Sequence, residues 1–358
     1  MDKKVLRVGI VGCGEIAQVA HLPLLQELPN FKVTALCDLS EKILNYLGPL
    51  YNVENLYTDY NELVKSDDVD VVLVSTKDHA PVTIAAMNAG KHVFCEKPMC
   101  FNLEEADAII AAEKASGVKY MIGMMKRQDP AFQYVLPMIK ELDDVHLVRV
   151  HDYAGDYTIN GEIYDEVRND DLPQEVRDAM VQSDMQKMIK GIGEDRKELA
   201  VAYSTLLYLL VHDAILLQEA FGRPTEIQYA DVYNDNTILA VLKFGEDIRC
   251  VYEGALLLKR RDWDETFEVF SDSKRISVNF PFPYIKNAQT LVKINEQDKD
   301  DPKANVDKTV YVSYDEAFKR EWRHFYECIT EDKVPYTTSE KARNDIELSA
   351  NIIKAVKL

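Results

Sequence analysis

Residues 5–17 read VLRVGIVGCGEIA, and this stretch decides the fold of the first part of the chain. The apolar run 5–11 is rich in β-branched residues, which predicts a buried strand of a parallel sheet. It leads into Gly12-x-Gly14-x-x-Ala17, and an amphipathic stretch follows, so the order is strand, tight turn and helix. In this context a glycine-rich turn holds a dinucleotide pyrophosphate at the helix N-terminus.

The residues of the turn have separate physical roles. Gly12 permits the tight turn, Gly14 lets the backbone approach the pyrophosphate, and Ala17 still allows the helix to pack closely on the strand. The free N–H groups at the start of the helix favour an anion. Glu15 and Ile16 open that helix, and they are therefore predicted to join the glycines as cofactor contacts.

An acidic residue ends the second predicted strand, residues 31–37. Asp38 stands where a carboxylate accepts hydrogen bonds from the adenosine ribose and repels a 2′-phosphate. Glu41 adds negative charge and no Arg follows directly. The pattern therefore predicts NAD in preference to NADP. The alternative for Asp38 is that it caps the helix opening at Leu39-Ser40-Glu41.

Strands and helices alternate through the first 125 residues. Apolar runs at 69–76, 92–95 and 118–124 predict further strands, and 81–88 predicts a helix. Alternation of this kind indicates a doubly wound parallel sheet, which binds ligands at the carboxyl ends of its strands. We therefore predict an NAD-binding domain over residues 1–125. The predicted contacts beyond the glycine turn are Asp38, Ser75, Thr76, His79, Glu96 and Lys97.

Three segments resemble the glucose–fructose oxidoreductase, inositol dehydrogenase and rhizopine-catabolism (Gfo/Idh/MocA) family. They are the glycine turn with His21-Leu22-Pro23, residues 89–98 (AGKHVFCEKP), and residues 123–132, which fit the segment leaving the nucleotide domain. The resemblance implies a Rossmann domain followed by an α+β domain with an open, mainly antiparallel sheet. It also implies a nicotinamide-dependent dehydrogenase acting on a sugar, cyclitol or related polyol. One departure is that Thr76-Lys77-Asp78-His79 is shorter than the usual family loop, so this loop against the cofactor must differ.

The resemblance also implies catalytic roles. Hydride transfer from an alcohol needs a base for the hydroxyl proton and a donor for the developing alkoxide. By resemblance, Lys97 is that donor and a proton relay, and Glu96 lies near the nicotinamide ribose. Burial at a strand end would lower the pKa of the lysine. The alternative for Lys97 is a surface lysine before a turn fixed by Pro98.

The family's base is a His four residues after an Asp, and His212 aligns with it. Tyr208 stands in the Asp position, on the same helical face by its spacing. Asp213 lies about 100° round the helix and is expected to orient His212 or to contact substrate hydroxyls. Three interpretations remain: His212 is the base, assisted by Lys97 and Tyr208; His212 is a core histidine; or the missing Asp reports changed or lost chemistry.

Substrate binding is expected to involve Arg127, Lys97 and His212. Arg127 follows the last strand of the nucleotide domain and is placed to reach substrate oxygens, with an interface salt bridge as the alternative. The six cysteines show no zinc-ligand spacing, so no metal is predicted.

Residues 126–358 are predicted to form an α+β substrate-binding and oligomerisation domain. The acidic stretch 153–198 is interpreted as a solvated insertion, with a lid or an oligomer contact as alternatives. Consecutive strands from 226 to 294 favour antiparallel pairing, and 295–307 is expected to be a polar loop. A helix at 337–357 is expected to dock between the domains. The uncovered sheet face predicts a homodimer or homotetramer.

Composition excludes several partners. The formal charge of −19 over 358 residues argues against nucleic acid and anionic membranes, because phosphate binding needs clustered Lys and Arg. The apolar stretch 206–217 is broken by polar residues and is expected to be too short to span a bilayer. The N-terminus shows no secretion signal, and the cysteines are expected to be reduced and mostly buried, so a cytoplasmic protein is predicted.

The sequence thus predicts an NAD-dependent oxidoreductase that transfers a hydride between nicotinamide and a secondary alcohol or ketone of a small neutral polyol or sugar. One alternative is a relative that uses NAD transiently for elimination or glycoside cleavage. Another is a cofactor-binding regulator without catalysis. The intact Glu96-Lys97-Pro98 argues against the regulator, and Tyr208 in the Asp position argues for it.

Overall fold

The computed structural model describes residues 4–156 and 160–357, and the chain divides into two compact units. The first unit contains Met1–Met124, Gly161–Gly191 and Phe318–Ile346, and the second contains Met125–Asn160, Ile192–Ala317 and Glu347–Leu358. The boundary after Met124 lies next to the one expected from sequence, but two later segments join the first unit. The expected docking of the last helix between domains remains a prediction. Residues 157–159 of the predicted insertion lie outside the described residues.

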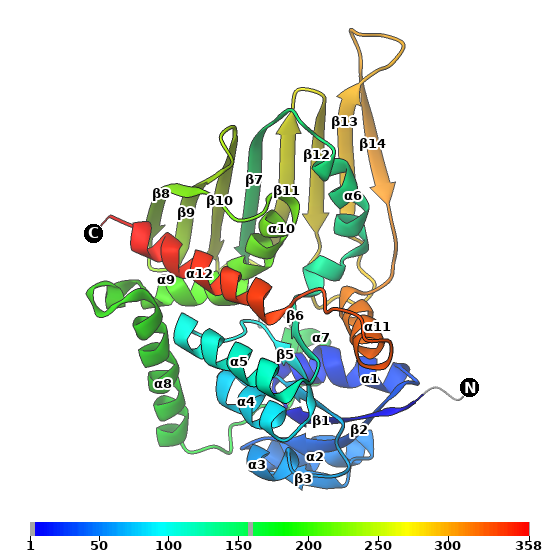
Figure 1. Ribbon diagram of the computed structural model, residues 1–358, viewed down its shortest axis with the longest axis vertical. Helices are drawn as coiled ribbons and strands as arrows, with labels where there is room; N and C mark the ends of the chain where they lie inside the picture. The colour runs from blue at the N-terminus through cyan, green and yellow to red at the C-terminus, as the bar shows by residue number, and fades with distance from the viewer. Residues whose placement is uncertain (1–3, 157–159, 358) are drawn as a thin grey trace. The chain divides into compact units, whose positions relative to one another are not determined.

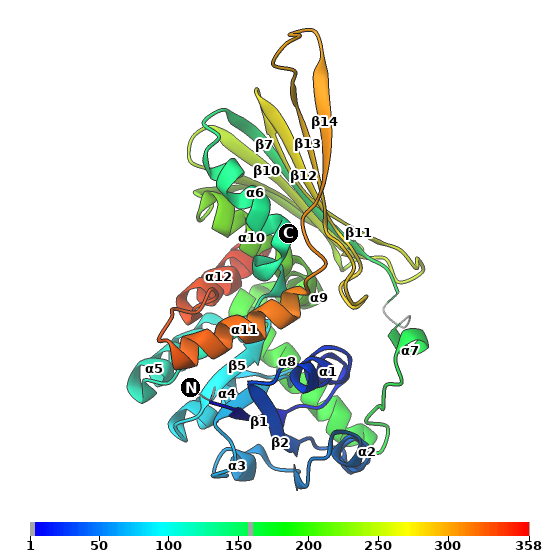
Figure 2. The same ribbon diagram turned by 90° about the vertical axis from the view of Figure 1, so that its right-hand side faces the viewer.

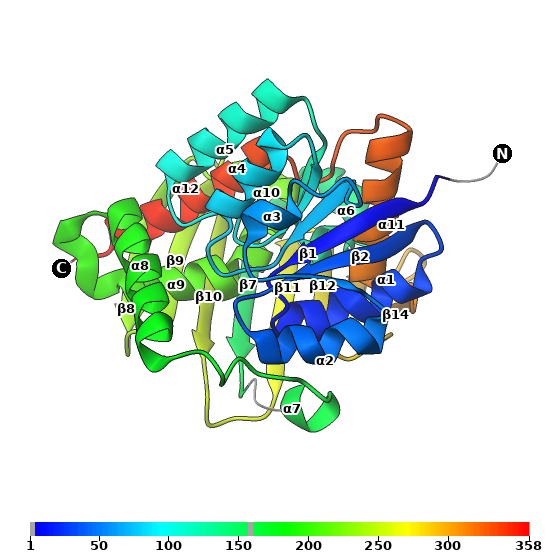
Figure 3. The same cartoon turned by 90° about the horizontal axis from the view of Figure 1, so that it is seen from below.

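A six-stranded sheet forms the centre of the first unit, in the order β3-β2-β1-β4-β5-β6. Its strands are β1 (Leu6–Val11), β2 (Phe31–Cys37), β3 (Asn55–Tyr57), β4 (Val71–Val74), β5 (His92–Glu96) and β6 (Tyr120–Gly123). All neighbouring pairs are parallel, which confirms the predicted doubly wound sheet. Strand β1 lies between β2 and β4, so the strand order reverses there. Figure 3 shows β1 and β2 side by side. Sheets of this kind bind ligands at that switch point.

Helices and a buried aromatic cluster surround this sheet. The helices of the unit are α1 (Leu22–Glu27), α2 (Glu41–Tyr51), α3 (Tyr60–Leu63), α4 (Ala80–Asn88), α5 (Leu103–Ser116), α7 (Asn160–Ile163), α8 (Gln174–Ile192) and α11 (Ala317–Thr330), with the first part of α12 (Ser339–Ala355). The turn η1 (Ala17–His21), which precedes α1, is π-helical. Trp322 of α11 is fully buried and stacks on Phe94 of β5 with ring centroids 4.5 Å apart. The sequence analysis did not foresee α11, although it completes this core.

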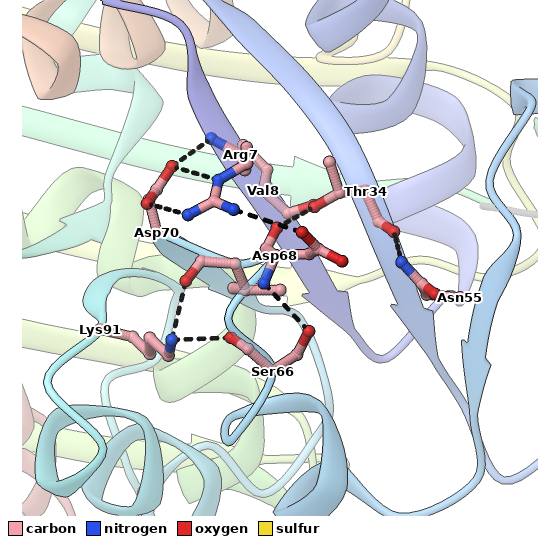
Figure 4. Close-up of polar contacts among 9 residues, drawn as sticks. Arg7, Val8, Thr34, Asn55, Ser66, Asp68, Asp70 and Lys91 are labelled. Carbon is pink, nitrogen blue, oxygen red and sulfur yellow. Dashed lines mark hydrogen bonds and ion pairs between the residues drawn. The ribbon is translucent and has the colours of Figure 1, made fainter.

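Charged side chains fix the amino ends of the parallel strands (Figure 4). The backbone N–H, Nε and a terminal nitrogen of Arg7 donate to the carboxylate of Asp70 over 2.9, 3.0 and 2.8 Å. Lys91 Nζ donates to the carbonyls of Ser66 and Val69 over 2.8 and 2.9 Å. These contacts join the strands at the edge opposite to the glycine turn. They therefore support the sheet without occupying the ligand-binding edge.

The second unit is built on an eight-stranded sheet in the order β14-β13-β12-β11-β7-β10-β9-β8 (Figure 1). Its strands are β7 (Val145–Ala154), β8 (Glu226–Tyr233), β9 (Thr237–Phe244), β10 (Ile248–Leu256), β11 (Trp263–Ser271), β12 (Lys274–Phe280), β13 (Leu291–Gln297) and β14 (Asn305–Tyr311). Figure 2 shows α6 (Pro130–Lys140) and α10 (Val211–Phe221) on one face of this sheet. The sheet is mainly antiparallel, as predicted.

Two details of this sheet differ from the prediction. Strands β10 and β11 are consecutive in sequence, but β7 lies between them, parallel to β10 and antiparallel to β11. The expected antiparallel pairing of consecutive strands was therefore wrong at that connection. The expected loop 295–307 contains the end of β13 and the start of β14, which pair with each other. β14 is an edge strand whose side chains are mostly exposed, so its polar composition resembles that of a loop.

The helical stretch Glu194–Phe221 includes η4 (Glu194–Leu199), α9 (Ala200–Thr205), the π-helical η5 (Leu206–Leu210) and α10. It is longer than the apolar run expected from sequence, and its length and composition would suit a membrane-crossing helix, with 72% of the apolar window buried inside the protein. Core helices of globular proteins share these properties. All six cysteines are free and buried, which confirms their expected burial.

Candidate functional site

The glycine turn at the end of β1 has the geometry that a pyrophosphate-binding turn needs. Gly12 has a φ of +89°, and a Cβ there would lie 2.6 Å from the backbone nitrogen of Thr76. A Cβ on Gly14 would meet nothing within 4 Å, so the backbone there can be approached closely. Ser75 Oγ donates to the carbonyl of Gly12 over 2.7 Å. The loops after β1 and β4 are thus held together beside an open glycine.

Asp38 is held at the carboxyl end of β2, beside this turn. Its carboxylate accepts the backbone N–H of Cys13 over 2.7 Å and that of Ser40 over 2.9 Å. Burial raises the pKa of Asp38, and these two hydrogen bonds oppose the rise. The helix α2 is capped by Ser40, whose Oγ accepts from Ile43 N over 3.2 Å. The alternative that Asp38 is the cap is therefore wrong.

The other predicted cofactor contacts follow β1 and β4. Glu15 and Ile16, both partly exposed, open the helix, which then widens into the π-helical turn η1. Thr76 Oγ1 donates to the carbonyl of Asp78 over 2.8 Å. His79 is buried, and its Nδ1 lies 2.5 Å from the carbonyl oxygen of Pro98. His79 thus links its loop to the Glu96-Lys97-Pro98 turn, and direct contact between His79 and a cofactor remains a prediction.

Glu96 ends β5 inside a buried hydrogen-bond chain. Trp322 Nε1 donates to His21 Nδ1 over 3.0 Å, so His21 carries its proton on Nε2 and donates to Glu96 Oε1 over 2.8 Å. Burial opposes ionisation of Glu96, but the hydrogen bond from His21 and the nearby charge of Lys97 outweigh it and lower its pKa. The backbone N–H of Lys97 donates to Glu96 Oε2 over 3.2 Å.

Lys97 therefore directly follows Glu96, whose side chain is held in place by its hydrogen bond with His21. The side chain of Lys97 is half-buried, and the peptide bond to Pro98 is cis. Gly12, Asp38, Ser75 and Lys97 all lie at the carboxyl edge of the same sheet, as the sequence predicted.

The predicted base and its neighbours lie in the second unit. Tyr208 and His212 are both half-buried, so neither is enclosed as an ordinary core residue would be. Tyr208 belongs to the π-helical turn η5, which alters the regular four-residue phase assumed from sequence. Tyr252 Oη donates to the carbonyl of Leu210 over 2.5 Å, which satisfies a carbonyl within that turn. The catalytic roles of Tyr208 and His212 remain predictions.

Asp213 belongs to a buried charged cluster that the sequence analysis did not identify. Oxygens of Asp152, Asp213 and Glu265 lie within 4.8 Å of one another, and Lys126 forms an ion pair with Glu265. Burial raises the pKa of Asp213, opposed by the charge of Lys126 and reinforced by that of Asp152. The carboxylate of Asp213 has no hydrogen-bond partner among the described residues, so the expected bond that orients His212 is not formed there.

The cluster carries its own cation. The ammonium of Lys126 is buried, and it lies 4.8 Å from the ring centroid of Phe280 and 5.8 Å from that of Trp263. Three carboxylates at this spacing would suit a divalent cation, but Lys126 already supplies positive charge at Glu265. We therefore interpret the cluster as an internal ion-pair network.

Arg127, predicted to bind substrate, is buried and forms an ion pair within the second unit. Its Nε lies 3.5 Å from Glu219 Oε2, on α10. This salt bridge joins two parts of the same unit, so it is not the interface salt bridge given as the alternative, and a substrate contact remains a prediction.

Sequence reasoning missed the His21–Trp322 contact and the partners of Asp213. A signal for the second existed in β7 and β11, where an acid interrupts an otherwise apolar face. Glu265 pairs directly with Asp152 across these strands. Two facing buried acids require a cation, and Lys126 directly precedes Arg127 in the segment 123–132.

Residues 6–124 match the family GFO_IDH_MocA, described as an oxidoreductase family with an NAD-binding Rossmann fold. An uncharacterized oxidoreductase, YrbE, of Bacillus subtilis is 29% identical over 42% of this chain and 45% of its own length. A myo-inositol 2-dehydrogenase of Thermotoga maritima is 32% identical over 40% of this chain and 44% of its own. The chain thus spans less than half of the length of these relatives.

One solved structure covers almost the whole chain. It is KijD10, a 3-ketoreductase from Actinomadura kijaniata in complex with NADP and TDP-benzene. It superimposes with a TM-score of 0.74 over 99% of this chain and 98% of that one, at 19% identity, a likeness that shows the fold. Residues 6–124 are therefore similar to the Gfo/Idh/MocA family of oxidoreductases, whose model matches this part of the chain.

Proposed function

We propose that the protein is an NAD-dependent oxidoreductase that interconverts a secondary alcohol and a ketone on a sugar, cyclitol or related polyol. The observation that carries the proposal is the convergence of an open glycine turn, Asp38 and Lys97 at one edge of the parallel sheet. This edge is where such sheets bind dinucleotides. The myo-inositol 2-dehydrogenase among the relatives supports a polyol as the substrate class.

The residues of the chain would divide the work as follows. A bound nicotinamide would supply the hydride acceptor or donor. The turn at Gly12 and Gly14 would hold the pyrophosphate, and Asp38 would accept hydrogen bonds from the adenosine ribose. Lys97 would donate to the substrate oxygen as negative charge develops there, and His212, with Tyr208, would take or return the hydroxyl proton. Arg127 is proposed to contact substrate oxygens.

NAD is proposed in preference to NADP because the ribose position is acidic. Asp38 stands at the carboxyl end of β2, Glu41 follows it, and no arginine lies directly after it. A 2′-phosphate there would be repelled. The solved relative KijD10 binds NADP, so the preference rests on these residues of the present chain.

The second candidate is a protein that binds the dinucleotide without net oxidation, either as a regulator or as an enzyme with transient redox chemistry. Tyr208 in the position of the family's Asp favours it. A transient-redox enzyme would form product without accumulating NADH, and a regulator would bind NAD and turn over no polyol.

We further propose a homodimer or homotetramer formed through the sheet face that α6 and α10 leave uncovered. Leu147 and Leu239 are each 37% exposed on the strands of this sheet, which supports a partner there. We also propose a cytoplasmic location with no nucleic acid or membrane as partner, which the acidic composition and the free cysteines support.

The experiment is to screen neutral polyols and sugars for NADH formation. Lys97→Ala and His212→Ala should each abolish turnover, whereas Lys65→Ala, an exposed lysine of the same unit, should not. Turnover that survives Lys97→Ala would refute the assigned chemistry. Tight NADH binding with no turnover on any polyol would favour the second candidate.

A further inference from the structure

Residues 164–192, here called the strap, run along the ligand-binding edge of the first unit. The strap leads into α8, and Figures 2 and 3 show it passing α2 before α8 begins. Sequence analysis interpreted this stretch as a solvated insertion. Met188 is nevertheless buried, and the strap bonds to the segments that follow β1, β2, β4 and β5. It therefore belongs to the same edge as the glycine turn.

The first attachment of the strap is at the helix that follows the glycine turn. Gln18 Nε2 donates to the carbonyl of Val167 over 2.9 Å, and Val167 N donates back to Gln18 Oε1 over 2.9 Å. The same Nε2 also donates to the carbonyl of Cys13 over 2.8 Å. This two-way contact fixes the register of the strap beside the turn.

The second attachment places a carboxylate at the start of α2. Asp171 accepts the hydroxyl of Ser40 over 2.6 Å and the backbone N–H of Lys42 over 3.1 Å. The adjacent Asp170 pairs with Lys42 Nζ over 2.7 Å. The hydrogen bonds from Ser40 and Lys42 lower the pKa of Asp171, so it is ionised at neutral pH.

These donors are next to the acid proposed to bind the ribose. The backbone N–H of Ser40 donates to Asp38 itself, so the hydroxyl of Ser40 belongs to the same short turn as Asp38. A hydroxyl, a backbone N–H and a lysine at a helix N-terminus form a typical anion-binding set. In this protein Asp171 occupies the hydroxyl and the backbone N–H of that set, and Asp170 pairs with the ammonium of the lysine.

We propose that Asp171 is a specificity-determining residue of the dinucleotide site, because it occupies the donors that the 2′-phosphate of NADP would need. This inference rests on the proposed function. A 2′-phosphate would have to displace Asp171 from Ser40 and Lys42, and would then face Asp38 as well. The hydroxyl of NAD carries no charge and needs none of these donors. The strap thereby adds a second source of discrimination against NADP to the one that Asp38 provides.

The far end of the strap is attached independently of Asp171. Lys187 pairs with Asp78 and, over 3.1 Å, with Glu105, and its carbonyl accepts from Asn102 Nδ2 over 3.3 Å. This end offers a control, since releasing it loosens the strap without touching the donors at α2.

The test measures dissociation constants for NADH and NADPH by the fluorescence of the reduced nicotinamide. In Asp171→Ala, the constant for NADPH should fall by about tenfold or more while that for NADH stays within about threefold. Asp171→Asn should change the NADPH constant in the same direction but less, because its amide oxygen still accepts from Ser40. Glu175→Gln removes one charge from an exposed residue of the same strap and should leave the ratio unchanged.

Lys187→Ala separates specificity from loosening of the strap. If it shifts the NADPH to NADH ratio as much as Asp171→Ala does, the assigned role of Asp171 is overturned. An unchanged ratio in folded Asp171→Ala and Asp171→Asn, with NADH still bound, would also overturn it and would leave the proposed function intact. Failure of the unmodified protein to bind either nucleotide would overturn the proposed function itself.

Discussion

Replacing His21 with leucine should destabilise the first unit by about 3–5 kcal/mol. His21 is fully buried between two hydrogen bonds, one given to Glu96 over 2.8 Å and one received from Trp322 over 3.0 Å. Leucine fills a similar space but leaves both partners unsatisfied. A lost bond to a carboxylate costs about 1.5–3 kcal/mol and a buried orphan N–H about 1–3 kcal/mol. The two losses together span about 2.5–6 kcal/mol, and the expected value lies in the middle of that span.

The pH dependence of this effect has a definite sign. The pKa of Glu96 is lowered in the folded protein, so its ionised form stabilises the fold above the pKa of the unfolded chain. That contribution is lost as the pH falls through the folded pKa. The difference in the free energy of unfolding between the unmodified protein and His21→Leu should therefore have its full size at neutral pH and should become smaller below about pH 4.

Urea unfolding followed by tryptophan fluorescence is the assay. The chain has two tryptophans, and Trp263 lies in the second unit, so a Trp263→Phe background makes Trp322 the reporter. His21→Gln is the matched control, because its amide can both donate to Glu96 and accept from Trp322, and it should lose about 1–2 kcal/mol. Equal losses in His21→Gln and His21→Leu, or a loss in His21→Leu below about 1 kcal/mol, would refute the reasoning.

Three further predictions concern other polar and backbone positions. Burial, reinforced by the charge of Asp78, raises the pKa of Asp184 from 3.8 to about 6, so the stability of the protein falls as the pH rises through this window. Asp184→Asn should therefore raise the melting temperature near pH 8 but not near pH 4. An equal change at both pH values would contradict this prediction. Lys126→Met removes the cation paired with Glu265 and should lower the free energy of unfolding in urea by about 3–5 kcal/mol at neutral pH, and by less in acid. A neutral or stabilising result would show that the cluster needs no cation. Gly12 has a positive φ, and Gly12→Ala would place a Cβ 2.6 Å from Thr76 N. The substitution should weaken NADH binding by about tenfold or more in a fluorescence titration. Unchanged binding would show that the glycine turn is not part of the site.

Most of the parallel sheet of the first unit was predictable because β1, β2, β4, β5 and β6 are short apolar runs, whereas the edge strand β3 was not predicted. Strand β2 was predicted at its observed bounds, and Asp38 was expected at its carboxyl end. The Rossmann turn is a local signal, since Gly12, Gly14 and the helix after them lie within one short stretch. The parallel sheet then brings the other ends to the same edge without further information.

The missed side-chain contacts all depend on pairing between distant segments. Asp152 meets Glu265 only because β7 inserts between β10 and β11. Trp322 reaches His21 from the far end of the chain. The contact between Asp171 and Ser40 depends on the path of an acidic stretch whose composition resembles ordinary solvated surface. Composition and periodicity report burial along one element, and they carry no information about which charges meet.

The π-helical turn η5 is a further reason why the helix that carries Tyr208 and His212 was predicted imperfectly. The four-residue spacing of Tyr208 and His212 assumed a regular α-helix, and η5 changes the phase at Tyr208. No local residue of the run 206–210 signals such a turn, because all but Tyr208 are leucines.

The most direct test of the central claim is NADH titration of the purified protein, compared with Asp38→Ala and with Lys65→Ala as a control. The account predicts saturable binding by the unmodified protein and by Lys65→Ala, with binding of NADH weakened by about tenfold in Asp38→Ala. NADH binding that is absent from the unmodified protein, or unaffected by Asp38→Ala, would contradict the assignment of this edge as the dinucleotide site.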